Sequence, residues 1–113
     1  MKIPHLFLLT CILTYALIAE DGPVYHVPIH GTIDMGLPHY IQRVVITAEE
    51  NDAEAIIFDI DTFGGRVDAA TQIKDIILDS KVTTIAFINK RAISAGALIS
   101  LSCDSIFMTP GAS

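Results

Sequence analysis

Two glycines and a serine are the residues of this chain whose types and spacing could do chemistry together. Gly64 and Gly65 follow the apolar run 55–60, and Ser94 follows the apolar run 83–88. A Gly-Gly turn exposes backbone N–H groups that can bind an oxyanion. A serine that opens a helix presents its hydroxyl where the helix dipole stabilises developing negative charge. Two such turns side by side at one edge of a parallel sheet can form an acyl-transfer site.

The hydrophobic periodicity predicts the elements that position these residues. Runs that are apolar throughout are typical of strands buried on both faces, and apolar residues at i, i+3, i+4 and i+7 indicate amphipathic helices. We predict strands at 24–33, 55–60, 83–88 and 105–108, and helices at 38–50, 67–79 and 94–102. The alternating order favours an α/β domain with parallel strands and right-handed crossovers. Periodicity alone does not distinguish a spiral from a doubly wound sheet.

Both turns resemble segments of a known family. The segment I-D-T-F-G-G-R at 60–66 is similar to the I-D-T-P-G-G-R segment of the NfeD family, the membrane-bound ClpP-class serine proteases. The segment I-S-A-G-A at 93–97 resembles the A-S-A-G nucleophile segment of that family, and T-P-G-A-S at 109–113 resembles its A-P-G-T-S stretch. The resemblance covers Val24 to Ser113. It implies a partial ClpP-like serine protease domain over 24–113, an α/β ClpP/crotonase-like spiral with parallel strands and crossover helices, truncated at the C-terminus.

Ser94 is the candidate catalytic nucleophile. From its position alone, a serine that opens a helix is more often an N-cap, but the neighbouring Gly-Gly turn and the family resemblance favour the nucleophile. The N–H groups of Gly65 and Ala95 are the candidate oxyanion hole. The alternative for the glycines is a plain strand-to-helix turn that needs positive φ.

Three further residues are predicted to contact the substrate. Gly64 and Gly96 are small, and small residues let a substrate backbone come close. Phe63 departs from the family pattern, which has proline at this position. We expect the substitution to loosen the turn and to place a bulky ring near the entrance of the site.

No residue of this sequence matches the general base of the family. The resemblance implies a Ser-Lys dyad whose lysine follows the serine at a distance that falls beyond Ser113. Lys74, Lys81 and Lys90 all precede Ser94, and surface positions are expected for them. The Ser-His-Asp arrangement of ClpP itself also needs a later histidine. The chain therefore reads as a serine endopeptidase with a base beyond this sequence, or as a catalytically inactive ClpP-like binding or scaffold module at the membrane.

Two carboxylates near the end of the second predicted strand suggest a phosphatase as an alternative function. Asp59 and Asp61 are spaced as in the D-x-D-x-T motif of haloacid-dehalogenase-type phosphatases, but Thr62 comes one position early and Phe63 stands in its place. We expect Asp61 instead to accept N–H bonds within the turn.

Two histidines share one predicted strand face. His26 and His30 lie two pleats apart, but two imidazoles without a third ligand make a poor metal site. We therefore predict solvated histidines, no metal and no cofactor.

The net charge and the N-terminal segment indicate which partners and which cellular location to expect. Acidic residues outnumber basic ones by 13 to 7, giving a net charge of -6, and no basic patch supports nucleic-acid binding. Residues 1–19 read as a signal peptide or an N-terminal membrane anchor, because Lys2 precedes an apolar run that ends in small residues. Cleavage is favoured, and it would leave Cys103 as the single cysteine, expected in the core.

These observations lead to one functional hypothesis. The protein is expected to be exported, membrane-associated or periplasmic, and to cleave hydrophobic or membrane-proximal polypeptides. The family resemblance further implies a homo-oligomer, with a stomatin-like membrane protein as substrate or partner.

Overall fold

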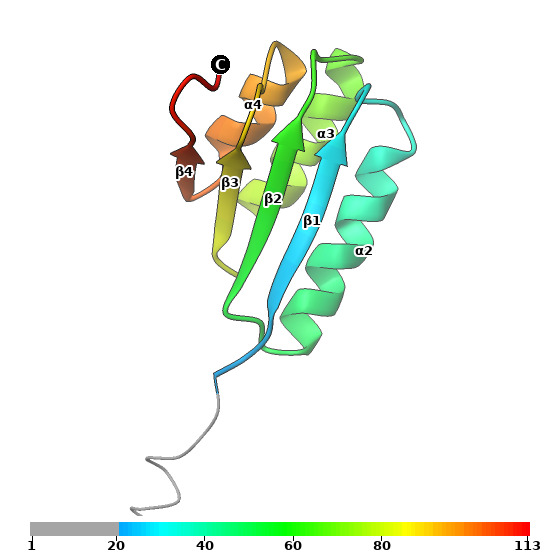
Figure 1. The fold of residues 1–113 in the computed structure, drawn as a ribbon. Coiled ribbons are helices and arrows are strands. Elements are labelled where there is room, and N and C mark those ends of the chain that lie inside the picture. The colour runs from blue at the N-terminus through cyan, green and yellow to red at the C-terminus, as the bar shows by residue number, and fades with distance from the viewer. Residues whose placement is uncertain (1–20) are drawn as a thin grey trace, which may run out of the picture.

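Within residues 21–113, four parallel strands form one sheet (Figure 1). In the computed structural model, which describes residues 21–113, these are β1 (Val24–His30), β2 (Ala55–Asp61), β3 (Thr84–Ile88) and β4 (Ser105–Met108). They lie in chain order, β1-β2-β3-β4, and every neighbouring pair is parallel. The predicted α/β architecture with parallel strands is therefore confirmed.

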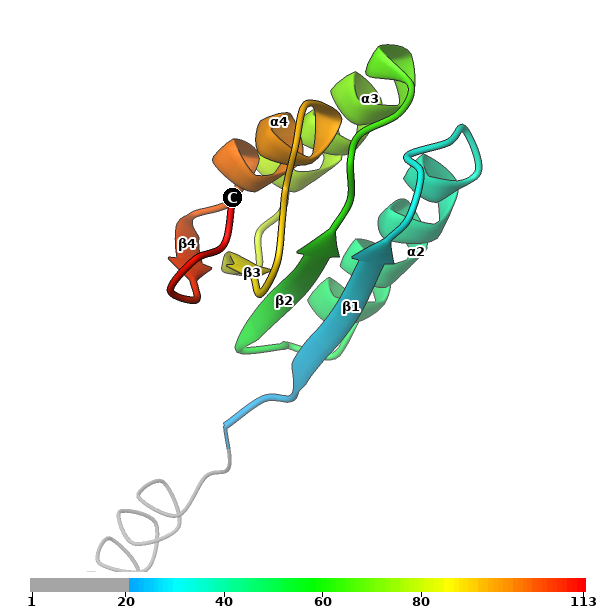
Figure 2. The ribbon, with the colours of Figure 1, turned by 45° about the horizontal axis from the view of Figure 1, so that its top comes forward.

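The three helices of the described chain lie together on one face of the sheet (Figure 2). They are α2 (Leu37–Glu50), α3 (Val67–Leu78) and α4 (Ala95–Ser102), and α3 packs between the other two. Right-handed crossovers that always step to the next strand in the same direction must place every helix on the same face. A doubly wound sheet reverses its strand order and carries helices on both faces. The structure therefore has the spiral arrangement.

The strands are buried on one face, so the prediction of burial on both faces is wrong. Along β2, Ile56, Phe58 and Ile60 are fully buried against the helices, whereas the intervening side chains are half-buried. The intervening positions include Asp59 and Asp61, whose charges suit the open face. The prediction rested on the apolar residues of this strand and gave no weight to Asp59.

The first strand ends earlier than predicted. β1 stops at His30 because Gly31, with φ 85°, turns the chain away from the sheet. Ile33 then forms a separate parallel bridge with Gly65, and Thr62 forms another with Ala92. A second, smaller layer of strand pairing thus begins where the main strands end.

Cys103 lies at the margin of the core, where it packs half-buried against the cluster between sheet and helices. Burial raises the pKa of its thiol to about 12. The thiol therefore stays protonated at neutral pH, as expected of a packing cysteine rather than a reactive one.

Among residues 21–113, no helix combines the length and the apolar character needed to cross a bilayer. The signal peptide or membrane anchor predicted at 1–19 lies outside the described residues.

Candidate active site

The loops that follow β2 and β3 lie side by side, as their place after parallel strands predicts. The N–H of Thr62 donates to the carbonyl oxygen of Arg91 at 3.2 Å, and the N–H of Ile93 donates to that of Thr62 at 3.1 Å. These two bonds join the segment before the Gly-Gly turn to the segment before Ser94. Both loops are at the carboxyl ends of the strands, where open α/β sheets commonly bind ligands.

The Ser94 side chain lies directly against Gly64. A Cβ atom placed on Gly64 would be 3.0 Å from the Ser94 Cβ and 3.4 Å from its Oγ. Only a residue without a side chain leaves this hydroxyl open. Gly65 follows in the chain, so standard bond lengths place its nitrogen at most about 7 Å from the hydroxyl. The two turns therefore meet, while the catalytic roles of their residues stay predictions.

Ser94 does not cap the helix that it precedes. Its side chain makes no capping hydrogen bond to α4, and the residue is exposed. Its backbone has φ 55° and ψ −114°, a conformation that residues with a side chain rarely adopt. Such strain costs about 1–3 kcal/mol and clusters at functional sites. Ser94 therefore stands at the N-cap position of α4, but its side chain does not do the capping that the N-cap alternative requires.

The two glycines differ in whether their N–H groups are free. The Gly64 N–H donates to the Thr62 Oγ1 at 3.0 Å. Within residues 21–113, the N–H groups of Gly65 and Ala95 donate to no acceptor of the protein. The free N–H groups are thus those of the predicted oxyanion pair.

Gly65 is tightly enclosed by the segment that follows β1. A Cβ at Gly65 would lie 2.6 Å from the backbone nitrogen of Ile33, and its φ is 157°. The Ile33 N–H donates to the Gly64 carbonyl oxygen at 3.0 Å, and the Arg66 N–H donates to the Ile33 carbonyl oxygen at 2.9 Å. This pairing fixes the direction of the Gly65 amide.

Thr62 organises the site, although the sequence reasoning gave it no role. It is buried, and its hydroxyl donates to the carbonyl oxygen of Gly31 while it accepts the Gly64 N–H. The hydroxyl thereby ties the end of β1 to the Gly-Gly turn. The available signal was the position of Thr62, which continues the alternation of buried residues in β2, because a buried hydroxyl needs partners.

Gly96 packs against this threonine. The residue is buried, and a Cβ there would lie 2.5 Å from the Thr62 Cγ2. This contact explains why the position carries no side chain. The substrate-binding role predicted for Gly96 stays a prediction.

Phe63 projects outward, and Arg91 stacks on it. The Phe63 side chain is 72% exposed, and the guanidinium carbon of Arg91 lies 4.6 Å from the centre of its ring. Arg91 Nη1 donates to Asp61 Oδ1 at 3.3 Å. The expectation that Asp61 accepts N–H bonds of the turn is therefore wrong, because its carboxylate pairs with the neighbouring loop instead.

A hollow of about 250 Å³ opens beside this pair. We call it the strand-end hollow, because its lining comes from the ends of three strands: Gly31 and Thr32 after β1, residues 61–64 at the end of β2, and Arg91 after β3. Ser94 borders it only through Gly64. Phe63 lines this hollow, and its place near the entrance of the site stays a prediction.

No buried lysine lies within residues 21–113. Lys74 is half-buried and pairs with Asp75 at 2.9 Å, while Lys81 and Lys90 are exposed. A neutral lysine base needs burial to lower its pKa. These lysines therefore have the surface positions that the sequence predicted.

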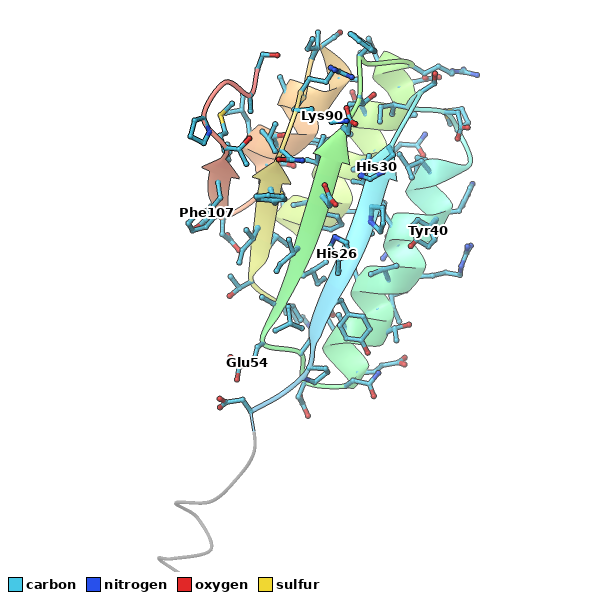
Figure 3. All side chains as sticks on the ribbon, in the orientation of Figure 1. His26, His30, Tyr40, Glu54, Lys90 and Phe107 are labelled. Atoms are coloured by element: carbon cyan, nitrogen blue, oxygen red, sulfur yellow. The ribbon has the colours of Figure 1, made fainter. Side chains whose placement is uncertain are left out.

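His26 and His30 flank Asp59 on the open face of the sheet (Figure 3). Their Nε2 atoms lie 3.1 Å and 3.4 Å from opposite oxygens of the carboxylate, and both side chains are more than half exposed. In the described part of the chain, no group of three or more histidine, cysteine or acidic side chains is placed to hold a metal ion.

Comparison with known proteins identifies the family. Residues 23–113 match the NfeD1b N-terminal domain. This chain belongs to that family. It is 41% identical over 93 residues to membrane protein NfeD1b of Bacillus subtilis, covering 82% of this chain. It is 39% identical over 93 residues to membrane-bound protease PH1510 of Pyrococcus horikoshii, covering 80% of this chain. The alignments span 21% of each relative, so the chain matches about a fifth of their length.

Solved structures share the fold of this NfeD1b N-terminal domain. A serine-to-alanine mutant of the 1510-N membrane-bound stomatin-specific protease superposes with a TM-score of 0.78 at 35% identity, over 83% of this chain and 47% of the other. A lysine-to-alanine mutant of that protease, in complex with a substrate peptide, gives 0.77 at 36% identity, over 83% and 44%. A ClpP1 mutant of Listeria monocytogenes gives 0.72 at 27% identity, over 77% and 52%. The predicted NfeD resemblance and ClpP-like fold are confirmed.

Proposed function

We propose that this domain supplies the nucleophile and the oxyanion hole of a serine endopeptidase. The observation that carries the proposal is the contact between the Ser94 side chain and Gly64, beside the free N–H groups of Gly65 and Ala95. A hydroxyl and two unpaired donors around one small space are what acyl transfer requires.

The reaction follows from this arrangement. Ser94 Oγ bonds to the substrate carbonyl carbon as its proton passes to a general base. The carbonyl electron pair moves onto oxygen, where the N–H groups of Gly65 and Ala95 bind it. Collapse of this intermediate breaks the C–N bond, and the leaving amine takes the proton from the base. Water then repeats the sequence on the acyl-enzyme.

We assign the general base to a lysine beyond Ser113. None of the three lysines of the described chain is buried, whereas a lysine that abstracts a proton near neutral pH must be. The related 1510-N protease has been solved as a serine-to-alanine and as a lysine-to-alanine mutant, which supports a Ser-Lys pair.

The substrate is an apolar polypeptide. Phe63, Val67 and Ile93 stand close to the Gly-Gly turn or to the serine in the chain, and they expose 72%, 71% and 40% of their side chains. Exposed apolar side chains gathered around one site are typical of a surface that binds apolar partners. The relatives are described as membrane proteins, and one as specific for a stomatin homolog, so we extend the proposal to a stomatin-like substrate and to membrane association. Export and a homo-oligomer remain part of the proposal and rest on the sequence alone.

A catalytically inactive binding or scaffold module is the second candidate. The absence of a buried lysine within residues 21–113 favours it. In that case the same apolar surface would bind a polypeptide without cleaving it. Cleavage activity distinguishes the two candidates.

The test uses the protein as its genome encodes it, with an apolar peptide as substrate. We expect Ser94→Ala to reduce cleavage to background, because the attacking oxygen is lost. Ser105, an exposed serine of β4, provides the matched control, and Ser105→Ala should cleave normally. Cleavage by Ser94→Ala at the normal rate would exclude Ser94 as the nucleophile. A parent protein that binds the peptide but never cleaves it would support the scaffold module.

A further inference from the structure

Phe63 is held in an exposed position by a chain of contacts rather than by burial. Arg91 lies over one face of the ring at 4.6 Å, and Asp61 holds Arg91 through a 3.3 Å hydrogen bond. A cation over an aromatic face is attracted by the ring quadrupole. The ring is therefore fixed in orientation while most of its surface remains in contact with water.

The strand-end hollow adjoins both the ring and the serine. Gly64 contributes to its lining and also contacts the Ser94 side chain. A polypeptide whose carbonyl carbon lies at Ser94 would therefore place a side chain near the scissile bond in this hollow. The volume of about 250 Å³ is below the 300–1,000 Å³ typical of pockets for whole small molecules, and it suits one side chain.

We propose that Phe63 and Arg91 form a specificity subsite that selects an apolar side chain of the substrate near the scissile bond. Phe63 contacts the substrate side chain, and Arg91 is a positioning residue that acts by holding the ring. The charge of Arg91 is already paired with Asp61, so the subsite offers apolar surface rather than an unpaired cation. This inference rests on the proposed function, because it takes Ser94 as the point where the substrate is held.

The test measures peptide binding in the Ser94→Ala background, so that cleavage does not interfere. The probes are a fluorescein-labelled decapeptide of alternating valine and leucine, flanked by lysines, and copies with one apolar residue replaced by asparagine or aspartate. We expect one position at which asparagine raises Kd about tenfold, the size expected for losing one buried apolar contact. The peptide with aspartate at that position should bind no more tightly than the peptide with asparagine.

Substitutions then assign that preference to the pair. We compare the Kd of the asparagine peptide with the Kd of the unsubstituted peptide. Phe63→Ala and Arg91→Ala should abolish the tenfold ratio of these two values at this position and leave the ratios at other positions unchanged. Phe107 provides the matched control, because it is also exposed but lies on β4. Its place on that strand is labelled in Figure 3. Phe107→Ala should keep the tenfold ratio, and urea unfolding verifies that each variant is folded.

The outcomes separate this inference from the proposed function. The subsite would be overturned by any of three results. The first is a tenfold ratio of Kd values that survives in Phe63→Ala. The second is an aspartate peptide that binds more tightly than the unsubstituted peptide, and the third is no peptide binding at all. Cleavage by the parent protein without a Phe63-dependent ratio would keep the protease and reject the subsite. A Phe63-dependent ratio in a protein that never cleaves would keep the subsite and reject the protease.

Discussion

Ser94 holds a backbone conformation that suits glycine far better than serine. Its φ of 55° and ψ of −114° follow from the tight connection between Ile93 and α4, in which the Ala97 N–H donates to the Ser94 carbonyl oxygen at 2.9 Å. The hydroxyl satisfies no helix N–H in return. A serine in a strained position without a structural task is best explained by the chemistry of its oxygen.

This strain predicts an unusual effect of glycine on stability. Because glycine adopts positive φ without a Cβ penalty, Ser94→Gly should have a free energy of unfolding about 1 kcal/mol higher than Ser94→Ala, even after the extra entropy of the unfolded glycine variant. Urea unfolding followed by circular dichroism measures the difference.

The control for this effect is an exposed serine in regular strand conformation. Ser105→Gly should be less stable than Ser105→Ala, by about 0.5–1 kcal/mol. If glycine lowers stability relative to alanine at residue 94 as well, the backbone there is not strained.

At the scale of elements, buried Thr62 joins three loops that would otherwise be independent. Its side chain contacts the end of β1 at Gly31, the Gly-Gly turn at Gly64 and the start of α4 at Gly96. The bridges between Thr62 and Ala92 and between Ile33 and Gly65 continue this connection into the smaller strand layer. The position of the serine relative to the glycines depends on this layer.

Removing only the hydroxyl tests that dependence. Thr62→Val keeps the volume but leaves the Gly64 N–H and the Gly31 carbonyl oxygen without their partner. We expect a loss of about 1–3 kcal/mol in the free energy of unfolding, measured in urea. The exposed residue Thr83 serves as control, and Thr83→Val should change stability by less than about 0.5 kcal/mol. Equal effects at both positions would contradict the role of Thr62.

The sequence predicted the elements well and the smaller strand layer not at all. Apolar periodicity located the three helices and the four strands of residues 21–113, because one face of each element must be buried. The smaller strand layer consists of two single bridges, one at Ile33 and one at Thr62, which are too short to produce a periodic pattern. The pairing of Arg91 with Asp61 was likewise invisible, because two charges far apart in sequence carry no signal of contact.

On the scale of the molecule, the three helices of residues 21–113 cover one face of the sheet and leave the other face open (Figure 1). The open face carries His26 and His30, each of which contacts the carboxylate of Asp59. The candidate site occupies neither face but the end of the sheet where the strands finish. This placement lets the loops vary while the sheet keeps them in register.

The prediction of the fold combined the order of strands and helices with the two family-like turns. Alternating strands and helices left both a spiral and a doubly wound sheet open, and the two family-like turns favoured the spiral. The strand order β1-β2-β3-β4 and the superpositions on the 1510-N and ClpP1 structures agree with that choice. The general base could not be placed, because no lysine of the described chain is buried near Ser94.

The central claim is that the Ser94 hydroxyl and the free N–H groups of Gly65 and Ala95 surround one carbonyl-sized space. A crystal structure of the genome-encoded protein with an apolar peptide boronic acid tests it most directly, since boron forms a tetrahedral adduct that mimics the intermediate. We predict a bond from Ser94 Oγ to boron, with one boronate oxygen within hydrogen-bond distance of both N–H groups. An adduct on another residue, or a boronate oxygen that contacts neither N–H group, would contradict the account.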